Sequence, residues 1–367
     1  MNGVNYMNKP KYKVPSMKEI QDLEWNGFKV VSTFSGCGGS CLGYRMANYK
    51  VVYANEFIEE AQKTYKLNHP NSYLDTRDIR KVTAEDIFRV TGLKKGELDL
   101  FDGSPPCSAF STSGKREKGW GKAKKYSDNK VQQVENLFFE YSRLLRDLQP
   151  KVFVAENVSG LVKGKAKGYF KLILQELKSC GYEVKAQLLN GKWLGVPQAR
   201  ERIIFIGVRK DLGLSPVFPK PLPYYYTIKD AFVDLPESNE EHARELREKA
   251  KGLKWQKILS QIPKNPPKPL SGEYVTPGSN FNLIRACLHR PCNTITAQGG
   301  RAGGVCHPLE DRKFTIEEVK RLSSIPDDFI LTGTFEQQWE RLGRLVPSVM
   351  MSHVAKTIER EILCKIK

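Results

Sequence analysis

The chain has 367 residues, with 59 Lys and Arg against 41 Asp and Glu, a formal net charge of +18. This length allows one large α/β domain with a smaller one, or two comparable domains. The longest apolar runs fall far short of the roughly 20 residues of a membrane span, which excludes an integral membrane protein. The basic charge favours a polyanionic partner, nucleic acid before an anionic membrane.

The N-terminal 25 residues are polar and contain no apolar signal-peptide core. We therefore expect a cytoplasmic protein whose cysteines are reduced. Cys287, Cys292, Cys306 and His307 are close in sequence, but their spacing is not that of paired zinc ligands. We expect no metal site.

Residues 28–210 alternate strand-like and helix-like segments, which predicts an α/β fold with a doubly wound parallel sheet. In chain order, strands are expected over 28–34 and 49–54, then ending near Asp78, then over 98–102 and 151–156. Helices are expected over 40–48, 57–68, 134–148 and around 170–177, the last ending at Gly181. Two strands over 183–190 and 202–208 close the series.

The alternating pattern stops after residue 210, where prolines cluster around a charged segment, 239–254, that predicts a solvated helix. From residue 290 the pattern returns to helices, including an amphipathic one through 346–362. We therefore predict an N-terminal extension (1–27), a catalytic domain (28–210 with 290–367) and a small inserted domain (211–289).

A glycine-rich loop, Phe34-Ser35-Gly36-Cys37-Gly38-Gly39, joins the first strand to its helix. Such a loop lets the backbone approach a ligand, and Glu56 at the end of the next strand is placed to accept from ribose hydroxyls. NAD, FAD or another adenosine cofactor would fit equally well, and so would a tight turn without ligand. Asp78 could accept from an adenine amino group or cap a helix.

Three further patterns follow at the ends of later strands. They are Pro105-Pro106-Cys107, Glu156-Asn157-Val158 and Gln198-Ala199-Arg200-Glu201-Arg202. A thiol, a carboxylate and two guanidiniums in this order predict covalent catalysis on a polarised ring.

In these motifs the chain resembles the S-adenosylmethionine-dependent DNA cytosine-5 methyltransferases, from Val30 to about Ile366. Further matching segments are Asn55-Glu56-Phe57, Arg77-Asp78-Ile79, Arg290–Thr296, and Arg321-Leu322 with Ile325–Phe329. The resemblance implies a Rossmann-like catalytic domain with 211–289 as the target-recognition domain. It also implies the small, single-chain, monomeric type of bacterial and phage modification systems, with which a cognate restriction endonuclease can be paired.

The resemblance implies catalytic roles for Cys107, Glu156 and Arg202, with Arg200 as a supporting charge. Cys107 would attack C6 of cytosine, Glu156 would hydrogen-bond N3 and the amino group, and Arg202 would hold O2. The S-adenosylmethionine-binding residues it implies are Phe34, Ser35, Gly36, Cys37, Gly38, Gly39, Glu56, Phe57, Asp78, Ile79, Pro106 and Leu137.

Because cytosine is stacked inside a duplex, this chemistry requires the base to be flipped out of double-stranded DNA. The basic segment 114–130 is expected to be a lid over DNA phosphates. Tyr224, Tyr225 and Tyr226 lie in the region where sequence readout is expected. The predicted DNA-binding residues are Ser113, Lys115, Arg116, Lys118 and Arg285.

One motif departs from the family pattern, since Arg344 stands where the family usually has Asn before the Val346-Pro347 pair. The Asn-type cofactor contact is therefore not expected here, and two alternatives stay open: the Arg344 side chain faces elsewhere, or it meets the methionine carboxylate. The alternatives are a tRNA cytosine-5 methyltransferase, whose Cys-Phe-Thr tripeptide is absent, and a DNA-binding relative without turnover. A nicotinamide oxidoreductase would share only the glycine loop.

Overall fold

The computed structural model describes residues 9–106, 137–162, 167–278, 282–300 and 303–366. It also describes two short paired strands, β5 (Lys124–Lys125) and β6 (Val131–Gln132). The chain divides into two compact units. We call residues 22–189, 201–220 and 351–367 the sheet unit, and residues 1–21, 190–200 and 221–350 the second unit.

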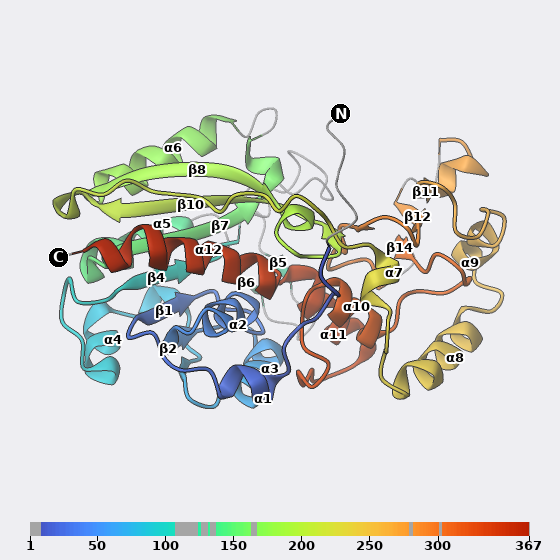
Figure 1. Cartoon of the computed structure of the whole chain (residues 1–367), viewed down its shortest axis with the longest axis horizontal. Coiled ribbons are helices and arrows are strands. Elements are labelled where there is room, and N and C mark those ends of the chain that lie inside the picture. The colour runs from blue at the N-terminus through green and yellow to red at the C-terminus, as the bar shows by residue number, and fades with distance from the viewer. Residues whose placement is uncertain are drawn as a thin grey trace. The chain divides into compact units, whose positions relative to one another are not determined.

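The sheet unit is built on seven strands in the order β3-β2-β1-β4-β7-β10-β8, side by side in Figure 1. They are β1 (Lys29–Thr33), β2 (Lys50–Asn55), β3 (Tyr73–Asp75), β4 (Leu100–Gly103), β7 (Val152–Val158), β8 (Tyr182–Asn190) and β10 (Glu201–Arg209). Strands β1, β2, β3, β4 and β7 are parallel, and β10 runs antiparallel to β7. The predicted α/β class with a mostly parallel sheet is confirmed.

This topology places the carboxyl ends of the parallel strands along one edge of the sheet, where open α/β folds bind ligands. The predicted strands agree with the observed ones to within a few residues. The largest difference is β3, which ends at Asp75, because Asp78 instead caps the short helix η2 (Ile79–Lys81).

The helices of the sheet unit are α2 (Gly39–Met46), α3 (Glu59–Asn68), α4 (Ala84–Thr91), α5 (Leu137–Leu148), α6 (Lys167–Ser179) and the greater part of α12 (Ser348–Glu361). The apolar stripe predicted for 134–148 is buried in α5, where Leu137, Tyr141 and Leu145 are fully covered. They join Phe101 and Phe153 of the sheet in one core cluster. Figure 1 shows α12 in front of the strands.

The second unit combines short strands and helices. Its helices are α1 (Met17–Gln21), α7 (Ile228–Ala231), α8 (Ser238–Ala250), α9 (Lys254–Leu259), α10 (Ile316–Leu322) and α11 (Phe335–Arg344). One sheet has the order β11 (Leu270–Ser271), β12 (Leu283–Arg285), β14 (Gly304–Cys306), and a separate pair joins β9 (Gln198–Ala199) to β13 (Cys292–Asn293). The helix expected over 239–254 is observed as α8, with α9 following it.

The N-terminal segment 9–21 belongs to the second unit. The buried Tyr12 donates its hydroxyl to the carbonyl of Arg321 at 2.7 Å, and its ring packs on Tyr226 with centroids 4.9 Å apart. Lys9 pairs with Asp230 at 2.7 Å. Residues 9–21 of the predicted extension are therefore an integral part of this unit. Among the described residues, no helix has the length and hydropathy to cross a membrane.

Candidate active site at the strand ends of the sheet

The glycine loop turns sharply between β1 and α2. Phe34, Gly36 and Gly38 all have positive φ, at 54°, 57° and 93°. A Cβ built on Gly38 would lie 2.1 Å from Nε2 of His69, so a side chain there is excluded by space as well as by conformation. The loop therefore requires glycine for its own shape, as predicted from the sequence.

Glu56 lies beside this loop at the end of β2. Its Oε2 accepts from the Gly36 N–H at 2.7 Å, and its Oε1 accepts from the Ile58 N–H at 2.6 Å. Backbone donors thus fix the carboxylate beside the loop. A fixed carboxylate beside a glycine loop, where a Cβ on Gly36 would meet nothing within 4 Å, fits an adenosyl group with ribose hydroxyls.

The other predicted cofactor residues are placed less directly. Asp78 accepts from the N–H and from Nη1 of Arg80, both at 3.0 Å, which is the capping alternative considered for it. Ile79 and Leu137 are buried in the core cluster of the sheet unit. Phe57 is half-buried against Ile58. Their contacts with a cofactor stay predictions.

Glu156 and Arg202 form an ion pair at the end of β7. The antiparallel register places Ile204 opposite Glu156, so Arg202, two residues away, is its diagonal neighbour on the same face. Arg202 Nε lies 2.5 Å from Glu156 Oε1, with both side chains about a tenth exposed. Burial lowers the pKa of Arg202, and the charge of Glu156 opposes this. The structure thus brings together two of the predicted catalytic residues.

The segment leading to Cys107 is held against the same strand. Asn157 Nδ2 donates to the carbonyl of Pro105 at 3.2 Å, which ties the Glu-Asn-Val motif to the Pro-Pro turn. At the end of β4, a Cβ on Gly103 would lie 2.5 Å from the ring of Tyr141. Cys107 itself, and Ser113, Lys115, Arg116 and Lys118, lie outside the described residues.

Sequence reasoning missed Asp102, a buried acid in β4 that accepts hydrogen bonds from Ser32 and Tyr44. The signal was present, because a carboxylate inside the apolar run 98–103 must have partners in the fold. The tethering role of Asn157 was also missed, although its motif was singled out.

Arg200, the predicted supporting charge, follows the short strand β9. It is buried in the second unit, where it donates to the carbonyls of Ile295 at 2.8 Å and Gly343 at 2.9 Å. These bonds join two segments that carry family motifs. They do not support the predicted role of Arg200 as a catalytic charge.

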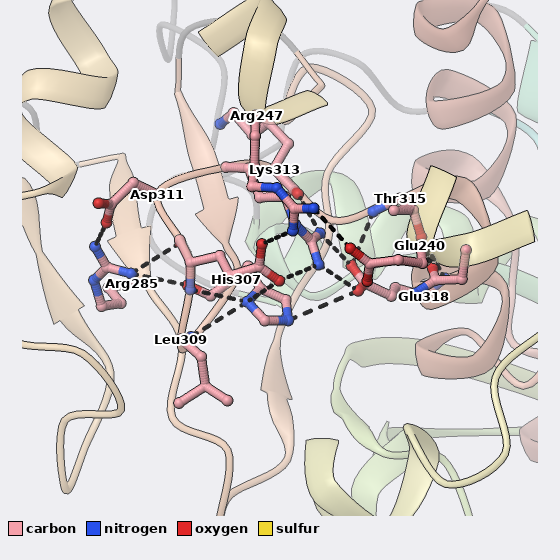
Figure 2. A network of polar contacts seen from close by, with 12 residues as sticks. Glu240, Arg247, Arg285, His307, Leu309, Asp311, Lys313, Thr315 and Glu318 are labelled. Atoms are coloured by element: carbon pink, nitrogen blue, oxygen red, sulfur yellow. Dashed lines mark hydrogen bonds and ion pairs between the residues drawn. The ribbon is translucent and has the colours of Figure 1, made fainter. Parts of the chain in front are cut away.

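The prediction that Arg285 contacts DNA is wrong. Its side chain is fully buried and lies in the polar network of the second unit shown in Figure 2. It pairs with Asp311 and donates to the carbonyls of His307, Glu310 and Leu259. A guanidinium with no exposed surface, whose two terminal nitrogens bond internal acceptors, does not reach a DNA phosphate.

Arg344, at which the C-terminal motif departs from the family pattern, forms an ion pair within α11, and its predicted alternative contact with the methionine carboxylate stays a prediction. Its guanidinium bonds Glu340 Oε1 at 2.6 Å, one turn earlier in α11. This agrees with the expectation that the Arg344 side chain faces elsewhere.

Comparison with known proteins agrees with this geometry. The model of the C-5 cytosine-specific DNA methylase family matches residues 28–360. The chain therefore belongs to this family and is a DNA cytosine-5 methyltransferase. It is 29% identical to the type II methyltransferase M.NgoPII of Neisseria gonorrhoeae, covering 94% of this chain and 99% of the relative. It is 30% identical to M.PspPI of Psychrobacter, covering 91% and 79%.

Solved structures show the same fold. A prophage-encoded DNA modification methyltransferase from E. coli aligns with a TM-score of 0.69 at 22% identity, covering 92% of this chain and 99% of that one. A DNMT2 variant from Spodoptera frugiperda aligns with a TM-score of 0.64 at 18% identity, covering 91% and 100%.

Proposed function

We propose that this methyltransferase uses S-adenosylmethionine to methylate C5 of a cytosine flipped out of a specific double-stranded DNA sequence. The observation that carries the proposal is the Glu156–Arg202 ion pair at the end of β7. Asn157 of the same strand donates a hydrogen bond to Pro105, in the segment that precedes Cys107. This is where a ring would meet a carboxylate, a guanidinium and a thiol.

The residues divide the chemistry among them. The Cys107 thiolate forms a bond to C6, while Glu156, which must be protonated for this step, donates its proton to N3 and Arg202 holds O2, so charge does not build up on the ring. The resulting enamine makes C5 nucleophilic. The bound cofactor would supply an electrophilic methyl group on a sulfonium. After C5 has taken the methyl group, the C5 proton is lost to solvent, N3 returns its proton to Glu156, and the C6–S bond breaks to release the Cys107 thiolate and restore the ring.

The glycine loop and Glu56 would hold the cofactor, with the carboxylate accepting from ribose hydroxyls. Loss of Glu56 should therefore weaken S-adenosylmethionine binding. Calorimetry on Glu56→Ala tests this, and an unchanged affinity would refute the role.

DNA recognition is proposed for 211–289 and for the basic segment 114–130 as a lid. The charge of +18 supports a phosphate-rich partner. Because the relatives named above are type II methyltransferases, we also propose a modification role in the cytoplasm, by a monomer, with a cognate endonuclease acting on the same site.

The decisive experiment is expression with plasmid DNA, followed by mapping of 5-methylcytosine at base resolution. Methylation at one short sequence is expected, and Cys107→Ser should abolish it while DNA binding persists. Duplex containing 5-fluorocytosine should become covalently joined to the wild-type chain in the presence of S-adenosylmethionine. Methylation of tRNA in place of DNA, or an active preparation without the adduct, would overturn the proposal.

A further inference from the structure

The Asp102 carboxylate binds both arms of the glycine loop. Its Oδ2 accepts from Ser32 Oγ at 2.8 Å in β1, the strand that enters the loop. Its Oδ1 accepts from Tyr44 OH at 2.9 Å in α2, the helix that leaves the loop. Asp102, Ser32 and Tyr44 are all buried.

The bond to Ser32 extends into the loop. Ser35 Oγ donates to the carbonyl and to Oγ of Ser32, at 3.2 and 3.1 Å. A loop with three residues in the left-handed region is held in shape by its surroundings. The Asp102–Ser32–Ser35 chain, with Tyr44 on the other arm, supplies this restraint.

The same residue begins the segment that leads to the nucleophile. The Asp102 carbonyl accepts from Thr33 Oγ1 at 3.2 Å, and the Ser104 N–H donates to the Thr33 carbonyl at 3.4 Å. Cys107 follows five residues after Asp102. Asp102 is therefore hydrogen-bonded to both sides of the glycine loop. It also lies in the strand that leads directly into the segment of Cys107.

We propose that Asp102 is a positioning residue that fixes the shape of the cofactor loop and its register against the nucleophile segment. This rests on the proposed function, in which that loop binds S-adenosylmethionine. Asp102 touches neither substrate nor cofactor in this scheme. It acts through Ser32, Ser35 and Tyr44.

The chain offers a matched control at the other end of the same strand. Asp99 is also buried, and its carboxylate bonds Lys151 Nζ at 2.7 Å and the Lys29 N–H at 2.9 Å. Asp99→Asn removes a carboxylate from β4 at the end away from the loop. It should lower the melting temperature and leave the dissociation constant for S-adenosylmethionine within about twofold of wild type.

The test is calorimetric titration of the full chain with S-adenosylmethionine. Asp102→Asn and Tyr44→Phe should each weaken binding about tenfold, the effect of losing one charge-assisted hydrogen bond. Both substitutions disrupt the hydrogen bond between Tyr44 and Asp102. The double variant should therefore bind S-adenosylmethionine at most about twofold more weakly than Asp102→Asn alone. DNA affinity in a gel-shift assay should be unchanged. Tyr44→Phe keeps the buried ring and so tests the bond even where Asp102→Asn folds poorly.

Two outcomes would overturn the inference. One is wild-type affinity in both variants, and the other is a pattern like that of Asp99→Asn, in which only the melting temperature falls. If the wild-type chain itself binds no S-adenosylmethionine, the proposed function fails as well. If the wild-type chain binds and the Asp102 and Tyr44 variants bind equally, only the role of Asp102 fails.

Discussion

The two units differ in how completely they bury their paired charged side chains. In the second unit, Arg312 bonds Glu318 twice and Glu310 once, at 2.8 to 2.9 Å, and the Arg312 and Glu318 side chains are each 2% exposed. In the sheet unit, the Glu156–Arg202 pair keeps about a tenth of each side chain exposed at a strand end.

This difference in exposure distinguishes a charged network that stabilises the fold from an ion pair that we propose takes part in the reaction. Removing one member of a fully buried pair leaves an uncompensated charge, so such a network determines whether the unit folds. A pair that still meets solvent at a ligand-binding edge can exchange water for substrate. Variants in the first network should therefore change stability, and variants in the second should change the reaction.

The largest effect is expected at Arg312. Arg312→Met should leave Glu318 buried without its main partner and destabilise the chain by about 3–5 kcal/mol, as measured by urea unfolding. S-adenosylmethionine affinity, which we propose to be a property of the sheet unit, should be retained below the unfolding transition. Equal losses of stability and affinity would contradict the distinction between the units.

Arg202→Met tests the other side of the comparison. It should lower the methylation rate by roughly 10²–10³-fold, because a buried donor to the developing charge is lost. The control is Arg146→Gln, which removes a surface pair between α5 and α6. A rate within tenfold of wild type in Arg202→Met would show that the pair is structural.

The stability contributions of His307 in the second unit and Asp102 in the sheet unit should depend on pH in opposite directions. His307 Nδ1 accepts from the N–H groups of Leu309 and Glu310, so the ring must be neutral at that atom. Burial lowers the pKa of His307 to about 4 from 6.5, with Arg312 and Arg285 adding to this and Glu318 and Glu310 opposing it. The contribution of the neutral His307 ring to the free energy of unfolding is full above pH 6.5 and is lost as the pH falls through about 4. It amounts to about 3 kcal/mol.

Asp102 should show the reverse sign. Burial raises its pKa from 3.8 to about 7; Ser32 and Tyr44 oppose the shift and Glu156 adds to it. Other titratable groups around it are Cys41 and Tyr141. Its contribution to stability is full below pH 3.8 and is lost as the pH rises through about 7. Urea unfolding of His307→Gln and Asp102→Asn between pH 4 and 8 measures both. Parallel changes in the two variants would refute the assignment.

The smallest effect is expected at the N-terminal segment. Tyr12→Phe removes the hydroxyl bonded to Arg321 and should cost about 1 kcal/mol. Thermal unfolding measures this, with Lys11→Gln as the control because its pair with Asp234 is exposed. An equal loss in both variants would mean that the hydroxyl contributes nothing specific.

The sequence predicted the sheet unit well because its strands and helices carry local apolar patterns of sufficient length, as α5 does. The strands of the second unit, only two or three residues each, are too short to show a period. The proximity of two side chains was predictable where motifs indicated it, as with Glu156 and Arg202, which pair across adjacent strands; their catalytic roles stay predictions.

Exposure was not predictable from residue type. Arg200 and Arg202 are two residues apart, yet the first binds carbonyls of the second unit and the second pairs with Glu156. Arg285 was taken for a DNA ligand because of its charge. Its neighbours Leu283, Ala286 and Cys287 are buried, and this apolar context was the available indication that Arg285 is buried as well.

The second unit draws its residues from three stretches of chain, and the first of them is the N-terminal segment. Exchanging only 221–289 for the corresponding part of a relative would leave Lys9 and Tyr12 against foreign side chains in place of Asp230 and Tyr226. Chimeras built to test whether this region determines sequence specificity, as we propose, should therefore transplant residues 9–21 together with it.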